Sequence, residues 1–292
     1  MNPTPTDPTR VSRAVTSRNN TLMRDPRSRA PHSPARMRAR AHPSVPSARD
    51  AAKPRARPRS IVRTMSQPSS DVPVRPSLVV FDLDACFWDE EMFRLSHLVD
   101  PSRSIRGALG EGLGDGVVAV MSGSTEIRIH PGALRAMQDF ALGKFPATTR
   151  FACASSADTP LAVRIGRSAL DELEIIPGVS AREVFAIGWP EGFEGNLQIG
   201  RTPPLSANKA ATHFPILRRE TGVPYDEMLF FDDCGWEDHC YAVATKCVEA
   251  RSGLGPVTVR APRGIRPEEW ERGLAAFDAR ARADRPLAAH EP

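Results

Sequence analysis

Acidic, hydroxyl and basic side chains recur in this sequence next to short apolar runs. Two aspartates follow Leu78–Phe81, two serines follow Phe151–Ala154, and two more aspartates follow Met228–Phe231. Carboxylates that converge repel one another unless a cation lies among them, and a hard dication with oxygen ligands is typically Mg²⁺. A lysine and a hydroxyl beside such a cation could hold the oxygens of a phosphate. The pattern therefore predicts phosphoryl-transfer chemistry carried by Asp82, Asp84, Ser155, Ser156, Lys209, Asp232 and Asp233.

The first carboxylate of this set, Asp82, is the predicted nucleophile. An Asp needs no base before attack, since its reference pKa of about 3.9 keeps it anionic near neutral pH. A Ser nucleophile would need an activating His, and no suitable His follows an apolar run here. Asp84 could protonate the leaving oxygen and later deprotonate the attacking water, which requires a raised pKa. Ser155 and Lys209 would bind the phosphoryl oxygens, with Ser156 beside them.

The elements that must position these residues are short apolar runs alternating with amphipathic segments. This pattern predicts an α/β fold with a doubly wound, Rossmann-like parallel sheet. We expect strands at Leu78–Phe81, Phe151–Ala154, Val184–Ile187, Met228–Phe231 and Val257–Val259. Helices are expected from His130 toward Leu142, from Thr159 toward Leu173, over Ala207–Arg219 and from Arg266 through Phe277.

The carboxyl ends of parallel strands meet at one edge of a sheet, where ligands bind in open α/β folds. A single pair of carboxylates after a strand could be a helix cap or a turn. Four segments that deliver functional groups to the same edge are not explained as caps. We therefore expect one crevice to hold all the candidate residues.

Three stretches resemble the motifs of the magnesium-dependent phosphatase family of the haloacid-dehalogenase (HAD) superfamily. They are VVFDLDACFWD at 79–89, CASSAD at 153–158 and NKAATHFPILRRETGVPYDEMLFFDD at 208–233. The resemblance spans 77–282. It implies a HAD-like fold, Mg²⁺ dependence and hydrolysis of phosphomonoesters through an aspartyl phosphate on Asp82.

The resemblance also implies how the metal is held. Its ligands would be the carboxylate of Asp82, the backbone carbonyl of Asp84 and the carboxylate of Asp233. Asp232, beside the last of these, is a secondary candidate. Asp238 follows at a spacing seen in the superfamily and would orient metal-bound water.

The cysteines raise two separate questions. Cys86 stands where the family has Thr or Val, and Cys234 begins a departure from the fourth motif of the animal proteins. Both would place a thiol beside the site, so oxidation could silence the protein, or both could simply be packing residues. Cys234, His239 and Cys240 lack the second Cys pair of a zinc ribbon or finger, so ordinary thiols are favoured over a zinc site. Five cysteines without a secreted disulfide spacing predict a reducing compartment.

Two inserts bear on the substrate. Residues 88–130, which include GALGEGLGDG, are too short for a large cap domain and predict a small flap or minimal cap over an open crevice. In the insert Gly188–Ser206, Trp189, Phe193 and Arg201 could grip a substrate or could pack the loop itself. The resemblance admits phosphorylated sugars, phosphosugar adducts on proteins and phosphotyrosine. The expected partner is thus a phosphorylated small molecule, such as a sugar phosphate, or a phosphoprotein.

The first 76 residues differ in composition from the rest. They hold fifteen Arg and one Lys against four Asp, so this stretch carries about +12 while the whole chain carries +4. Such an Arg-, Pro- and Ser-rich stretch predicts a disordered basic extension before a domain at 77–282, and 283–292 is expected to fray. The composition is also typical of an organelle transit peptide, which would direct the protein to a plastid or mitochondrion. Translation from Met65 would instead leave it in the cytoplasm.

Nucleic acid and membrane are not expected partners. The basic extension contains no aromatic residue that could stack on bases. No apolar stretch approaches the roughly 18 residues that cross a bilayer, and no apolar core of a secretory signal begins the chain. The sequence does not indicate an oligomeric state.

Three alternatives to a phosphatase remain at this point. A haloacid dehalogenase would not be expected to keep an acid at Asp84. A phosphotransferase would pass the same phosphoryl group to another acceptor. An inactive scaffold would retain the fold alone, because fold does not imply function.

Overall fold

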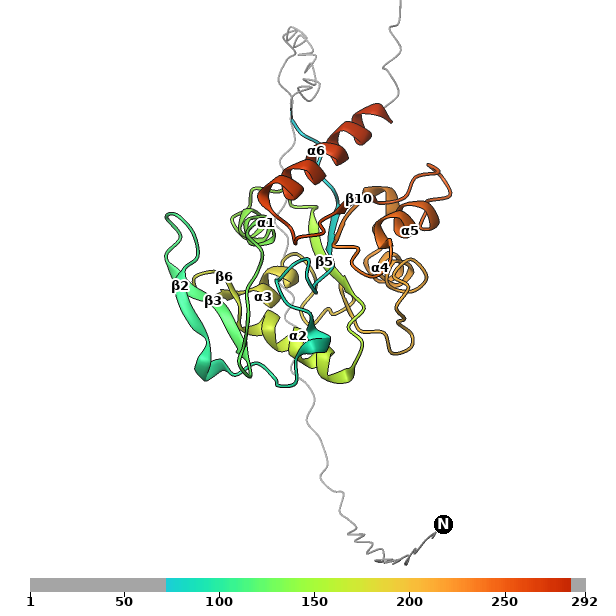
Figure 1. Ribbon diagram of the computed structural model, residues 1–292. Coiled ribbons are helices and arrows are strands. Elements are labelled where there is room, and N and C mark those ends of the chain that lie inside the picture. Colours follow the sequence, from blue (N-terminus) through green and yellow to red (C-terminus); the bar gives the residue numbers. More distant parts are fainter. Residues whose placement is uncertain (1–71, 285–292) are drawn as a thin grey trace, which may run out of the picture. The chain divides into compact units, whose positions relative to one another are not determined.

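The computed structural model describes residues 72–284, whose centre is a five-stranded sheet in the order β10-β9-β1-β5-β8 (Figure 1). All four strand pairs are parallel. The strands are β1 (Leu78–Phe81), β5 (Arg150–Ser155), β8 (Leu197–Ile199), β9 (Met228–Asp232) and β10 (Val257–Arg260). All four residues of β1 are buried, because this apolar strand is covered on both faces.

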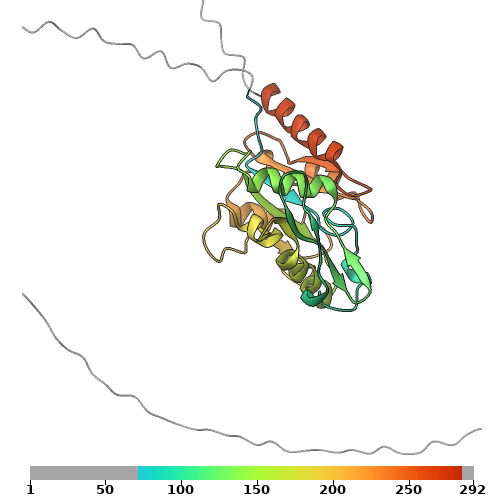
Figure 2. The ribbon, with the colours of Figure 1, turned by 90° about the vertical axis from the view of Figure 1, so that its left-hand side faces the viewer.

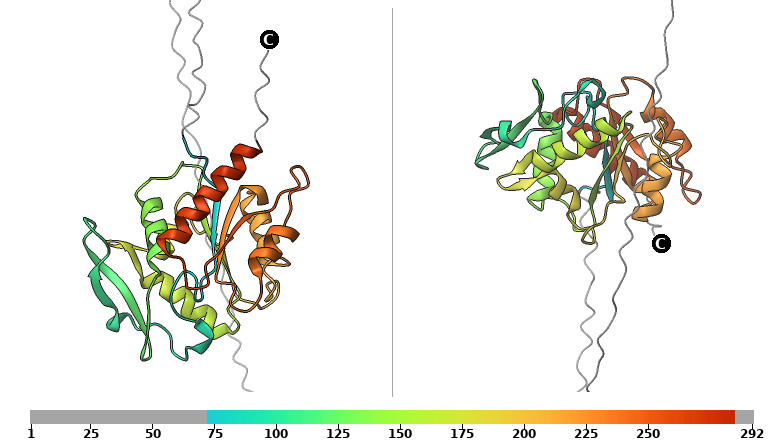
Figure 3. Two further views of the ribbon diagram at one scale, coloured as in Figure 1. Left: turned by 45° about the horizontal axis from the view of Figure 1, so that its top comes forward. Right: turned by 90° about the horizontal axis from the view of Figure 1, so that it is seen from below.

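Helices cover both faces of the sheet (Figures 2 and 3). On one face, Val79 and Phe81 of β1 belong to an apolar cluster with buried residues of α1 (Pro131–Ala141), α2 (Pro160–Glu172), α3 (Ala181–Ala186) and α6 (Pro267–Ala283). On the other face, Leu78 and Val80 cluster with α4 (His213–Thr221) and α5 (His239–Lys246). Alternate β1 side chains thus enter opposite cores, and the predicted doubly wound α/β fold is confirmed.

One predicted strand is wrong. Residues 184–187 are not a strand, since 181–186 form α3, which begins with a capping box between Ser180 and Glu183. Val184 and Phe185 are fully buried on this short helix. The edge strand is β8, which lies within the insert Gly188–Ser206 and pairs with β5.

Two helix boundaries also differ from the prediction, and one 3₁₀ helix was not predicted. α4 begins at His213 instead of Ala207, so Lys209 lies in the turn before the helix. α6 continues to Ala283, past Phe277. A 3₁₀ helix, η3 (Tyr225–Glu227), precedes β9.

The segment 88–130 is small and partly regular. It contains two 3₁₀ helices, η1 (Met92–Arg94) and η2 (Pro101–Arg103), and an antiparallel sheet of β2 (Ile105–Ala108), β3 (Asp115–Ser122) and β4 (Thr125–Ile127). β3 packs against β6 (Glu174–Ile176), which pairs with β7 (Val179–Ser180). The β2–β3 hairpin thus lies beside β6 (Figure 1), and η1 contacts α2.

The predictions for the basic extension and for 283–292 fall almost wholly outside the described residues. Between residues 72 and 284, no helix combines the length and apolar character needed to span a membrane.

Candidate active site

A cavity of about 390 Å³ opens at the carboxyl edge of the sheet. Its floor brings together six of the eight predicted site residues, which are Asp82, Asp84, Ser155, Ser156, Lys209 and Asp233. They come from the ends of β1, β5 and β9 and from the turn before α4. Separate segments thus meet at one crevice for these six residues, whereas Asp232 and Asp238 do not line the cavity.

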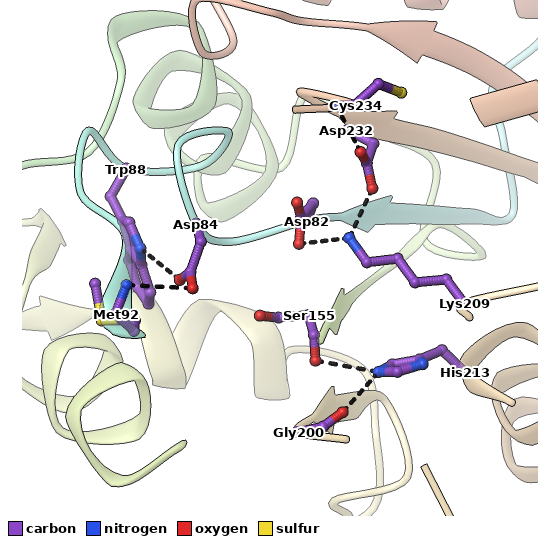
Figure 4. Close-up of polar contacts among 10 residues, drawn as sticks. All are labelled: Asp82, Asp84, Trp88, Met92, Ser155, Gly200, Lys209, His213, Asp232 and Cys234. Atoms are coloured by element: carbon purple, nitrogen blue, oxygen red, sulfur yellow. Dashed lines mark hydrogen bonds and ion pairs between the residues drawn. The ribbon is translucent and has the colours of Figure 1, made fainter. Parts of the chain in front are cut away.

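Lys209 is the centre of the polar contacts (Figure 4). Its Nζ lies 2.7 Å from Oδ1 of Asp82 and 2.6 Å from Oδ2 of Asp232. Both aspartates end neighbouring parallel strands, and the Asp82 amide donates to the Phe231 carbonyl at 2.9 Å. Burial opposes the charge on Lys209, but Asp232 and Asp82 together raise its pKa, so the ammonium is retained.

Three carboxylates in this region could bind a metal ion. Asp82, Asp232 and Asp233 each offer one oxygen, and these oxygens lie within 4.8 Å of one another. Burial raises the pKa values of Asp82 and Asp233, and Asp232 raises both further. One ammonium does not balance three carboxylates, and an all-oxygen donor set suits a hard dication such as Mg²⁺. The residues therefore fit a divalent cation, and Asp232, expected to be secondary, belongs to the central group.

The carboxylate of Asp84 points away from this group (Figure 4). The Trp88 indole Nε1 donates to its Oδ1 at 3.3 Å, and the Met92 amide donates to its Oδ2 at 3.2 Å. Burial, aided by the nearby Glu91, raises the pKa of Asp84 to about 7, while both hydrogen bonds oppose the rise. A carboxyl in this range can exchange a proton near neutral pH, as the predicted acid–base role requires.

Ser155 ends β5, and its backbone carbonyl contacts His213, a residue that was not predicted to belong to the site. Nε2 of His213 lies 3.1 Å from the carbonyl oxygens of both Ser155 and Gly200, and the Gly200 amide also donates to Ser155 at 2.8 Å. Burial, with Lys209 nearby, lowers the pKa of His213 to about 4. The ring is therefore neutral, and its Nε2–H donates to both carbonyls. No sequence pattern indicates this contact, because the two carbonyls lie 58 and 13 residues away along the chain.

Asp238 is not brought into the cavity. It caps α5, where its carboxylate accepts from the Tyr241 amide at 3.0 Å, and it pairs with Arg260 at 3.3 Å. Trp189 and Phe193, two predicted substrate contacts, stack on each other with ring centroids 4.8 Å apart and do not line the cavity.

The departures from the family pattern have distinct places. Cys86 is fully buried in the core. Cys234 adopts a left-handed conformation with φ of 55°, and its amide donates to Asp232 Oδ1 at 2.7 Å. Next to it, Trp236 lines the cavity, together with Glu91, Phe93, Arg201, Glu237 and His239. Of these side chains, only Arg201 was predicted.

A parallel α/β sheet with an aspartate after its central strand, and with a buried lysine and an acidic pair at the same edge, is the arrangement of the HAD superfamily. The family model described as Acid Phosphatase matches residues 74–280, and the protein belongs to this family. No curated protein matches the chain. The predicted HAD resemblance is thus confirmed, and family membership supports phosphatase activity.

Proposed function

We propose that this protein is a Mg²⁺-dependent phosphomonoester hydrolase that forms an aspartyl phosphate on Asp82. The observation that carries the proposal is the buried contact of 2.7 Å between Asp82 and Lys209, at an edge where Asp232 and Asp233 could hold a cation. The substrate class follows from the same groups: a phosphorylated small molecule or a phosphoprotein.

In the first step, a carboxylate oxygen of Asp82 attacks phosphorus and the bond from phosphorus to the leaving oxygen breaks. Asp84 gives its proton to that oxygen. Lys209 has three N–H donors, of which Asp82 and Asp232 each accept one, so one remains for a phosphoryl oxygen. The Ser155 hydroxyl is a second donor, and its position is fixed through the His213 contact to its carbonyl.

In the second step, the Asp84 carboxylate takes a proton from water, whose oxygen attacks phosphorus. The bond from phosphorus to Asp82 breaks, inorganic phosphate leaves, and both carboxyl groups return to their starting states. Bound Mg²⁺, held by Asp82, Asp233 and the Asp84 carbonyl or Asp232, would offset the negative charge of carboxylates and phosphate.

The test is hydrolysis of an aryl phosphate by the full chain, with Mg²⁺ or with EDTA. Asp82→Asn should lower kcat by on the order of 10⁴-fold, because the amide is a poor nucleophile. EDTA should remove turnover and added Mg²⁺ should restore it. The matched control is Asp115→Asn, an exposed acid at the start of β3 that does not line the cavity.

Two results would change the assignment. Turnover retained in Asp82→Asn would show that the nucleophile is another group. Folded wild-type protein that binds phosphate without hydrolysing any ester would favour the inactive scaffold, and transfer to added alcohols in preference to water would favour a phosphotransferase.

A further inference from the structure

Two aromatic side chains stand exposed at the mouth of the cavity. Phe93 of η1 and Trp236 of the loop after β9 form an edge-to-face pair, with ring centroids 6.0 Å apart and an angle of 72°. Phe93 is 40% exposed and Trp236 is 77% exposed. Both line the same cavity as the catalytic carboxylates. Large apolar surface left open beside polar catalytic groups is typical of a ligand contact.

The proton donor fixes where the leaving group must lie. Under the proposed function, the leaving oxygen comes within hydrogen-bond reach of Asp84. The Met92 amide of η1 holds that carboxylate at 3.2 Å, and Phe93 is the next residue along the same 3₁₀ helix. A leaving group that extends outward from Asp84 therefore starts next to η1.

The rings of Phe93 and Trp236 differ in how much of their surface is free to contact a leaving group. The guanidinium of Arg94 lies 5.4 Å from the centroid of the Phe93 ring, so one side of Phe93 is already occupied. Phe93 in turn contacts Trp236, whose indole is the more exposed of the pair. Trp236 thus has an exposed, flat apolar surface, and its contact with Phe93 helps to position it.

The charges around the mouth of the cavity limit which leaving groups can bind against Trp236. Glu91, Glu237 and Asp158 line the cavity, against two exposed cations at the mouth: Arg201, which pairs with Asp158 at 3.7 Å, and Arg94, which lies over the Phe93 ring. The mouth is therefore net negative before Lys209 and the catalytic carboxylates are counted. A leaving group with its own negative charge would be repelled.

We propose that Phe93 and Trp236 form an aromatic clamp that binds the leaving group and selects phosphomonoesters whose leaving group has a flat apolar face and no negative charge. This inference rests on the proposed function, because it takes Asp84 as the proton donor. An aromatic ring and the apolar face of a hexose share this chemistry, and the experiment separates them.

The experiment compares wild type with Trp236→Ala in the full chain at saturating Mg²⁺. The substrates are phenyl phosphate, glucose 6-phosphate and glycerol 2-phosphate, of which the last has no flat face. For the variant, kcat/KM for phenyl phosphate relative to glycerol 2-phosphate should fall by about 3- to 10-fold, the range expected for one lost ring contact. A fall in the glucose 6-phosphate ratio as well would place hexoses in the clamp, and an unchanged glucose ratio would restrict it to aromatic rings.

Tyr241→Ala is the matched control, because Tyr241 is 67% exposed on α5 and does not line the cavity. It should leave every ratio unchanged. Unchanged ratios in Trp236→Ala, or the same ratio change in both variants, would overturn the clamp.

A binding measurement separates this inference from the proposed function. Calorimetry of phenyl phosphate with Asp82→Asn, with and without Trp236→Ala, requires no turnover. Weaker binding in the double variant would support the clamp even if the wild type hydrolysed none of the three esters, a result that would refute the proposed function alone. Hydrolysis by the wild type with equal binding by both variants would refute the clamp alone.

Discussion

At the scale of single residues, the pair Asp84 and Trp88 would set the proton chemistry of the proposed reaction. The carboxyl of Asp84 has a pKa of about 7, chiefly because it is buried, and the Trp88 hydrogen bond partly offsets this rise by stabilising the charged form. Only protonated Asp84 can donate a proton to the leaving oxygen. The kcat for an ester with a poor leaving group should therefore decline as pH rises past the pKa of Asp84.

Trp88→Phe should move that alkaline decline to higher pH. The substitution removes the N–H that stabilises the carboxylate, so the pKa of Asp84 rises and its acid form persists further into the alkaline range. The measurement is the pH profile of kcat at saturating Mg²⁺.

Trp270→Phe is the control for loss of a buried indole, since Trp270 packs against Phe231 in the core. It should lower Tm without moving the profile. An equal shift in both variants would mean that packing, and not the hydrogen bond, sets the pKa.

The identity of the candidate residues was largely predictable from the sequence, but the role of each residue was not. The sequence placed Asp232 second to Asp233, whereas Asp232 is fully buried against Lys209. Neighbouring residues at a strand end point to opposite sides, and a shift of one residue exchanges them. The register of β9 against β1 decides which one meets Lys209, and that register is a tertiary property. His213 was missed for the same reason.

At the scale of elements, two helical glycines differ in how much space surrounds them. A Cβ on Gly132, near the start of α1, would overlap the backbone of Arg266, whereas one on Gly166 of α2 would meet the Trp88 ring at an ordinary 3.7 Å. Gly132 therefore allows α1 to dock on the segment before α6, and its amide donates to the Ile265 carbonyl at 2.9 Å.

Opposite changes in stability should follow from the same substitution at these two sites. Gly132→Ala should destabilise the protein by about 1–3 kcal/mol, because backbone atoms cannot yield as a side chain can. Gly166→Ala should be neutral or stabilise it by up to about 1 kcal/mol, because Ala favours helix. Urea unfolding of both variants checks this, and equal effects would show that the close approach at Gly132 is relieved without cost.

The fold class was predictable because most strands are continuous apolar runs followed by polar groups. The exception was the third predicted strand. Val184 and Phe185 form a short apolar run that is equally suited to a buried strand or a buried helix turn, and the capping box decides for the helix. The true edge strand, β8, has three residues and a polar centre at Gln198, so its pattern was too short to recognise.

At the scale of the whole molecule, the catalytic unit lies in the later part of the chain. Every residue of the proposed mechanism falls within 74–280, the range of the family match. A chain that begins at Met65 should therefore keep kcat/KM within about twofold of the full-length value, since it retains every residue of the proposed mechanism. Loss of activity would show that the first 64 residues contribute to the site.

A chain that begins at residue 77, the boundary expected from sequence, should be less stable than one that begins at Met65. It would lose the hydrogen bond of 2.6 Å from the Val74 amide to Asp278, and the contact of 2.9 Å between Thr149 Oγ1 and the Pro76 carbonyl. Thermal unfolding of the two chains side by side measures the difference.

The bond between Val74 and Asp278, and the contact of 3.1 Å from the Arg282 guanidinium to the Val72 carbonyl, bring the two ends of the described domain close together. A domain whose two ends lie close together can tolerate circular permutation, in which the old ends are joined and new ends are made elsewhere. A short linker could join residue 284 to residue 72, with new ends cut between Gly110 and Gly114 at the tip of the β2–β3 hairpin. The circular permutant would keep the spatial order of the strands in the central sheet, although β1 would then be the last of these strands along the chain, so the same unit could be carried as an insertion within a host protein.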